Sequence, residues 1–149
     1  MQTTPMPLLD VHTTIIVAGA DDVWRALLDV LDAGGARAGA SLLTTLLGCA
    51  DRASSGPRPL AAGSTTPGFR VATADPGREL VLEGRHRFSS YALTFRIDRL
   101  GAGRSQLSVE SRATFPGVLG GAYGWVLSAS GLHVRIVRSL LASVRRRSE

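Results

Sequence analysis

The chain has 149 residues, a formal net charge of +5 and a single cysteine. A chain of this length buries enough surface to form a core without a metal ion, and one cysteine excludes an internal disulfide framework. Because the first nine residues lack the pattern of a signal peptide, we expect a cytoplasmic protein. We also expect one domain over residues 1–149, flexible in residues 1–8 and frayed in residues 148–149, with no cofactor and no metal.

The N-terminal segment predicts one strand. Residues 11–18 are rich in β-branched side chains, and Thr13, Ile15 and Val17 alternate with their neighbours along this segment. Such a composition is typical of a strand, because β-branched side chains fit a pleated surface.

Two short helices are predicted to follow. The first begins at Ala20 or Asp21 and stops at Gly34, with apolar positions spaced three and four apart. These positions are Val23, Trp24, Leu27, Leu28 and Leu31. The second extends over about residues 38–47. Residues 51–68 are rich in Gly, Pro and Ser, which predicts a loop or a weak edge strand.

From Phe69 to Phe115 apolar and polar residues alternate, which predicts four antiparallel strands with one apolar face. Turns are expected at Pro76–Gly77, near Ser89–Ser90 and at residues 101–103. The residues assigned to the apolar face are Phe69, Val71, Thr73, Leu80, Leu82, Gly84, His86, Phe88, Tyr91, Leu93, Phe95, Ile97, Leu107, Val109, Ser111, Ala113 and Phe115. Such a meander has to be covered on its apolar face, and we expect the last helix to be the cover.

Residues 118–147 predict that long amphipathic helix. Its apolar stripe recurs at steps of three and four. At 1.5 Å per residue the helix would be roughly 40 Å long, enough to cross a whole sheet. Residues 113–134 contain no Asp, Glu or Arg, but five glycines and several hydroxyl groups favour a helix covered by a sheet over a transmembrane segment.

This α+β order resembles the helix-grip fold of the START-like, or SRPBCC, superfamily, which includes polyketide cyclases and lipid-transfer START domains. The sequence ADDVWRALLD at residues 20–29 looks like the opening of many bacterial members, and residues 76–98 look like their central hairpin. Residues 111–117 are similar to the joint before the last helix. The resemblance implies a curved antiparallel sheet wrapped around a long C-terminal helix, with two short helices after the first strand. It also implies a cavity for a lipid, a polyketide or another apolar molecule.

Candidate site residues are those inward-facing positions that combine an apolar wall with a few hydroxyl and imidazole groups. They are Phe69, Val71, Leu82, His86, Tyr91, Leu93, Phe95, Val109, Ser111, Tyr123, Ser130 and His133. The first hypothesis is therefore binding or transport of a small hydrophobic ligand.

The alternative is a polyketide cyclase or dehydratase-type enzyme in the same cavity. His86 would act as general base, and Tyr91 would donate a hydrogen bond to a developing enolate oxygen. No carboxylate is expected on the inward faces to orient the histidine, which places binding ahead of catalysis.

A third interpretation concerns the arginine-rich end of the last helix, Arg145–Arg147, which could contact an anionic membrane or RNA. The simpler interpretation is that these cations complement the helix macrodipole. The three histidines are too scattered for metal-ligand spacing. We expect a small hydrophobic ligand as the partner, and no nucleic acid. We expect no transmembrane segment, and a monomer or homodimer. Peripheral membrane contact through Arg145–Arg147 is a weaker prediction than binding of the hydrophobic ligand.

Overall fold

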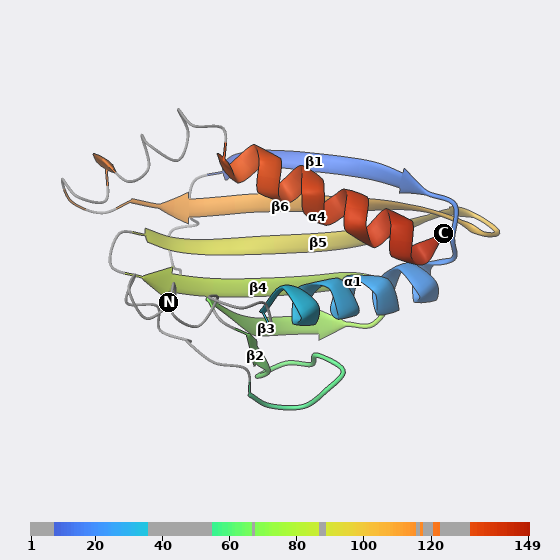
Figure 1. Cartoon of the computed structure of the whole chain (residues 1–149), viewed down its shortest axis with the longest axis horizontal. Coiled ribbons are helices and arrows are strands. Elements are labelled where there is room, and N and C mark those ends of the chain that lie inside the picture. The colour runs from blue at the N-terminus through green and yellow to red at the C-terminus, as the bar shows by residue number, and fades with distance from the viewer. Residues whose placement is uncertain are drawn as a thin grey trace, which may run out of the picture.

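The computed structural model describes residues 8–35, 55–66, 68–86, 89–115, 117, 121–122 and 132–149. Its six strands form one antiparallel sheet in the order β1-β6-β5-β4-β3-β2, with two helices on one face (Figure 1). In chain order the elements are β1 (Leu8–Ile16), α1 (Ala20–Gly35), β2 (Thr65–Thr66), β3 (Phe69–Asp75), β4 (Glu79–His86), β5 (Ser89–Gly101), β6 (Arg104–Thr114) and α4 (Leu132–Ser148). The α+β class and the helix-grip arrangement predicted from the sequence are confirmed.

Strands β5 and β6 form the centre of the sheet, and their predicted faces are confirmed. Phe95 and Ile97 of β5 are buried opposite Val109 and Leu107 of β6. Residues of the other parity, such as Arg96, lie on the outer face. Because directly opposed residues share a face, each buried pair extends the same apolar surface across the sheet.

The inward face of β1 carries the parity of Ile16 and not that of Ile15 and Val17. Ile16 is fully buried, whereas Ile15 and Val17 are 39% and 64% exposed. Ile16 lies opposite the buried Ser105 of β6, and this pairing determines which face of β1 is covered. The sequence contains β-branched residues at both parities here, so alternation alone could not choose between them.

Strand β3 contains an irregularity that the regular alternation did not predict. Val71 pairs with Leu82, but the next paired residue, Thr73, pairs with Val81, so the register shifts by one. A bulge of this kind moves the following side chains to the other face. Thr73 is therefore exposed rather than inward, and Ala74 packs against the core in its place.

Ser89 and Ser90, near which the sequence predicts a turn, belong to β5. They pair with His86 and Arg85, so strand pairing continues to the very end of β4.

The predicted second helix, residues 38–47, lies outside the described residues. The same is true of residues 118–131 of the predicted long helix, apart from residues 121 and 122, which are helical. The described part of that helix is α4, and its last turn carries Arg145, Arg146 and Arg147.

Helix α1 shares with α4 the covering role that the sequence assigned to α4 alone. The two helices contact each other; α1 also contacts β5, β6 and β2, and α4 contacts β1. Val23 and Leu27 of α1 are fully buried, as is Val144 of α4. No helix in the part of the chain described by the structure is long and apolar enough to cross a membrane.

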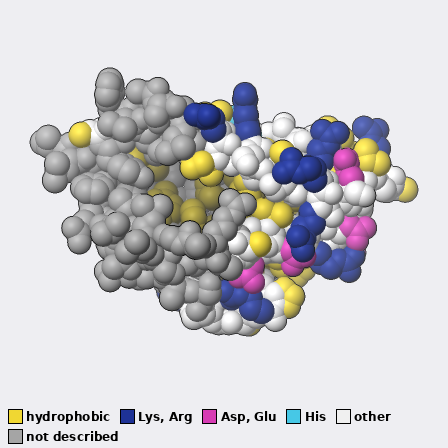
Figure 2. Space-filling model, in the orientation of Figure 1, with side chains coloured by type: hydrophobic (Ala, Val, Ile, Leu, Met, Phe, Trp, Pro, Cys, Tyr) yellow, Lys and Arg dark blue, Asp and Glu magenta, His cyan; other side chains and the backbone are white. Residues whose placement is uncertain are grey.

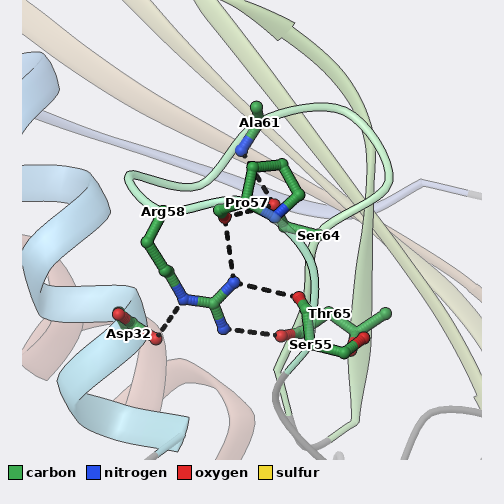
Figure 3. A network of polar contacts seen from close by, with 7 residues as sticks. All are labelled: Asp32, Ser55, Pro57, Arg58, Ala61, Ser64 and Thr65. Atoms are coloured by element: carbon green, nitrogen blue, oxygen red, sulfur yellow. Dashed lines mark hydrogen bonds and ion pairs between the residues drawn. The ribbon is translucent and has the colours of Figure 1, made fainter.

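The loop between α1 and β3 is attached to α1 by Arg58 (Figure 3). The Arg58 Nε atom donates to Asp32 Oδ1 of α1 at 3.1 Å, and the two terminal nitrogens donate to the carbonyl oxygens of Ser55, Pro57 and Thr65 at 2.9–3.1 Å. A planar guanidinium with five donors suits such a site, because its donors diverge at fixed angles. Residues 55–66, the described part of the segment predicted as a loop or weak edge strand, thus form a loop that ends in the two-residue edge strand β2.

We expect Arg58→Lys to lower the free energy of unfolding by roughly 1 kcal/mol, because an ammonium group cannot reproduce four diverging hydrogen bonds. Urea denaturation measures this. The matched control is Arg78→Lys, since Arg78 is mostly exposed and faces only Asp75 at 3.9 Å; its effect should stay below about 0.5 kcal/mol. Equal losses in the two variants would show that the Arg58 network adds nothing.

Candidate functional site

The predicted site residues that the structure describes lie on neighbouring strands of the inner face. Cross-strand pairing places Val71, Leu82, Leu93 and Ser111 in one row from β3 to β6. A neighbouring row contains Gly84 opposite Tyr91, and Tyr91 opposite Ala113. The sheet therefore brings these candidates together, although they are separated by up to about forty positions in the chain.

Some of these candidates are fully buried in the core, and others are only partly buried. Val71, Leu82, Phe95 and Val109 belong to the continuous hydrophobic core that the sheet shares with α1 and α4. Phe69 and Leu93 are only partly buried and pack against that core. Figure 2 shows hydrophobic side chains gathered near the middle of the face that carries the helices. We call Phe69, Leu82, Tyr91, Leu93 and Ser111 the inner wall.

Ser111 is the unusual member of the inner wall. It is 1% exposed, and its Oγ atom has no hydrogen-bond partner among the described residues. Ser105 lies on the same strand and face and is equally buried, but its Oγ donates to the Ala18 carbonyl at 2.9 Å. A buried hydroxyl without a partner costs about 1–3 kcal/mol. Ser111 is therefore a polar group that a bound molecule could satisfy.

Tyr91 is held in place on three sides. Its hydroxyl donates to the Gly68 carbonyl at 2.5 Å, and its ring meets the Phe69 ring edge-on, with centroids 5.2 Å apart. The ring also covers Gly84, where a side chain would collide with both the Gly68 carbonyl and the Tyr91 ring. The phenolic proton is thus used within the protein.

Four candidates cannot be placed. Tyr123 and Ser130 lie outside the described residues. His86 is the last residue of β4 and His133 is the second residue of α4, but their side chains are not among those described. Their roles stay predictions from the sequence.

The sequence did not reveal a histidine and carboxylate pair on β1. The His12 Nε2 atom lies 3.2 Å from Asp10 Oδ2, and both side chains are only about one-fifth exposed. They share the parity of the buried Ile16, so the expectation that no carboxylate occupies an inward face is wrong. Residues two apart on a strand point to the same side, and this Asp-x-His spacing was the signal available. Among the described residues no group of three His, Cys, Asp or Glu side chains could hold a metal ion.

Comparison by sequence identifies no relatives: neither a protein-family model nor a curated protein matches the chain. Solved structures do match. The Zhui aromatase/cyclase from a Streptomyces species superposes with a TM-score of 0.58 and 16% identity, over 97% of this chain and 96% of that one. A Rhizobium loti protein gives 0.59 and 12%, over 95% and 99%. Truncated norcoclaurine synthase from Thalictrum flavum gives 0.53 and 14%, over 99% and 96%.

These likenesses establish the fold. The chain has the helix-grip architecture of START-like, polyketide cyclase-like proteins, as the sequence resemblance implied. A shared fold at this level of identity does not carry an activity with it, because one fold hosts many functions.

We expect Ser111→Ala to leave the free energy of unfolding unchanged or to raise it by up to about 1 kcal/mol, because it removes a buried hydroxyl that has no partner. Ser105→Ala is the matched control and should lower stability by about 1–3 kcal/mol, since the Ala18 carbonyl loses its donor. Chemical denaturation of the ligand-free protein checks both. A large loss for Ser111→Ala would mean that this hydroxyl is satisfied within the protein.

Gly84→Ala should destabilise the protein by about 1–3 kcal/mol, because the new methyl group would overpack the contact between the Tyr91 ring and the Gly68 carbonyl. Gly121→Ala is the control: Gly121 is helical, exposed and open around its Cα, so alanine should be neutral or stabilising there. Thermal unfolding measures the two variants. Equal stability of Gly84→Ala and Gly121→Ala would contradict the close packing of the Tyr91 ring against Gly84 of β4.

Proposed function

We propose that this protein binds a small hydrophobic molecule that carries at least one polar group, between the inner wall and the helices, in the bacterial cytoplasm. The observation that carries this proposal is the Ser111 hydroxyl, which is buried on an apolar surface and has no hydrogen-bond partner among the residues that the structure describes. Pockets for such molecules combine apolar walls with a few polar groups that orient the ligand.

The composition of the inner wall supports a ligand of this type. Leu93 supplies partly buried apolar surface opposite Ser111, and Phe69 supplies more of it against the Tyr91 ring. The Ser111 hydroxyl can donate to a ligand carbonyl or accept from a ligand hydroxyl. A lipid or polyketide with a hydroxyl or carbonyl group fits this chemistry better than a pure hydrocarbon does.

The likeness to solved structures is consistent with this class of ligand. Two similar structures are named for reactions of organic molecules, an aromatase/cyclase and a norcoclaurine synthase. Binding and transport without chemistry remain our first proposal for this chain, because the Tyr91 proton is engaged with the Gly68 carbonyl rather than offered to a ligand.

A second candidate function is an enzyme of the cyclase or dehydratase type. The described observation in its favour is the His12 and Asp10 pair, since a carboxylate that fixes an imidazole is the usual arrangement around a general base. His86, the base proposed from the sequence, remains the other candidate for that role. The enzyme hypothesis predicts turnover that His12→Gln or His86→Gln abolishes while ligand retention persists.

The binding proposal is tested by native mass spectrometry after incubation with a bacterial lipid and polyketide extract. The parent protein should retain a defined small molecule. Leu93→Trp should reduce retention at least tenfold, because the indole would fill space beside Ser111 on the inner wall. The control Thr94→Trp places the same ring one residue later, on the outer face, and should retain the molecule.

Two results would contradict the proposal. One is the absence of any retained molecule in the parent protein. The other is equal retention by the Leu93→Trp and Thr94→Trp variants, which would place the bound molecule away from the inner wall.

A further inference from the structure

A groove of about 310 Å³ lies between β1 and α4, at the edge of the sheet. Its lining residues are His12, Thr13 and Thr14 of β1 and Arg138, Leu141, Ala142 and Arg145 of α4. None of them belongs to the inner wall. This volume is at the lower end of the range for small-molecule sites.

The helical side of the groove has apolar residues between two cations. Residues 138, 141, 142 and 145 lie on one face of α4, because they follow the helical period. Arg138 and Arg145 are therefore about 10 Å apart along the helix axis, with Leu141 and Ala142 between them. Along α4 the groove therefore presents a positive charge at each end and an apolar patch between them.

The two arginines differ in their partners. Arg145 Nε lies 3.4 Å from Glu149 Oε2. Arg138 has no hydrogen bond or ion pair within the described part of the chain, and its side chain is exposed. Arg138 is therefore the cation available to an incoming anion.

The protein already binds one carboxylate at this junction of strand and helix. The Val17 N–H, which directly follows β1, donates to Glu149 Oε2 at 2.9 Å. This hydrogen bond, together with Arg145, holds the pKa of the Glu149 carboxyl below its ordinary value. The Val17 N–H and the Arg145 guanidinium thus form a carboxylate-binding site at one end of the groove.

The nearest acidic group of β1 does not oppose an anion at Arg138. Asp10 is in contact with His12 at 3.2 Å, and neither Asp10 nor any other acidic residue lines the groove. Thr14 shares the inward parity of His12 and Ile16, and its hydroxyl is a neutral donor on the β1 side of the groove.

We propose that this groove binds a small amphiphilic carboxylate, with its carboxylate at Arg138 and the Thr14 hydroxyl and its apolar body on Leu141 and Ala142. The site is separate from the inner wall and does not depend on the function proposed for it. An ionised group at a guanidinium gives a strong, charge-assisted hydrogen bond, and the apolar body adds affinity by leaving water.

The test uses octanoate as the probe, with the Leu93→Trp variant as the background so that binding at the inner wall does not contribute. NMR titration of the Thr13, Thr14 and Ala142 amide resonances should show saturable shifts. Octanol should bind at least about tenfold more weakly, because it loses the charge-assisted contact. Acetate should also bind at least about tenfold more weakly, because it lacks the apolar body that leaves water on binding.

Arg138→Gln should weaken octanoate binding about tenfold, and Arg138→Lys, which keeps the charge, should fall between it and the parent. The control Arg135→Gln removes the same charge from an exposed position of α4 outside the groove and should change affinity less than twofold. The proposal is overturned by any of three results: no saturable shifts at these amides, octanol binding as tight as octanoate, or equal effects of Arg138→Gln and Arg135→Gln.

Discussion

The structure depends on one constraint: the central strands present an apolar face on one side only, and that face must be covered. Phe95 and Val109 are fully buried at its centre. Burial of each such side chain contributes about 1.5–3 kcal/mol to the free energy of unfolding. An exposed ion pair contributes less, about 0–1 kcal/mol. The placement of α1 and α4 on the same face follows from this requirement, because two helices side by side cover more of the sheet than either one alone.

Two buried serines on β6 have different surroundings. Ser105 lies near the end of the sheet where β1 turns toward α1, and the chain supplies the Ala18 carbonyl as its acceptor. Ser111 lies six residues further along the same face, and the described structure supplies no acceptor. A fold that needed only to cover its sheet would favour an apolar residue at Ser111. Packing of the described residues does not explain this hydroxyl, and our proposal assigns it to ligand binding.

Much of the fold follows from the sequence because β5 and β6 alternate strongly between apolar and charged residues. Other features did not follow, for identifiable reasons. β1 has β-branched residues at both parities, so only its pairing with Ser105 decides that Ile16 faces inward. The bulge after Val71 leaves no mark in composition. Asp10 fell outside the predicted strand, so its pairing with His12 was not seen.

The site itself was only partly predictable. The inward positions of Leu93 and Ser111 follow from period-two alternation, and the structure places them side by side. The partner of the Tyr91 hydroxyl could not be foreseen, because Gly68 belongs to a segment without periodicity. The groove at Arg138 requires the packing of α4 against β1, a contact between the two ends of the chain that no local pattern encodes.

The central claim is that the Ser111 hydroxyl is reserved for a ligand. A crystal structure of the protein with the molecule it retains from a bacterial extract tests this most directly. Our account predicts a polar atom of that molecule within 2.5–3.2 Å of Ser111 Oγ, the range of ordinary hydrogen bonds, with apolar atoms against Leu93 and Phe69. A filled interior in which Ser111 Oγ donates to a carbonyl of the protein itself would contradict it.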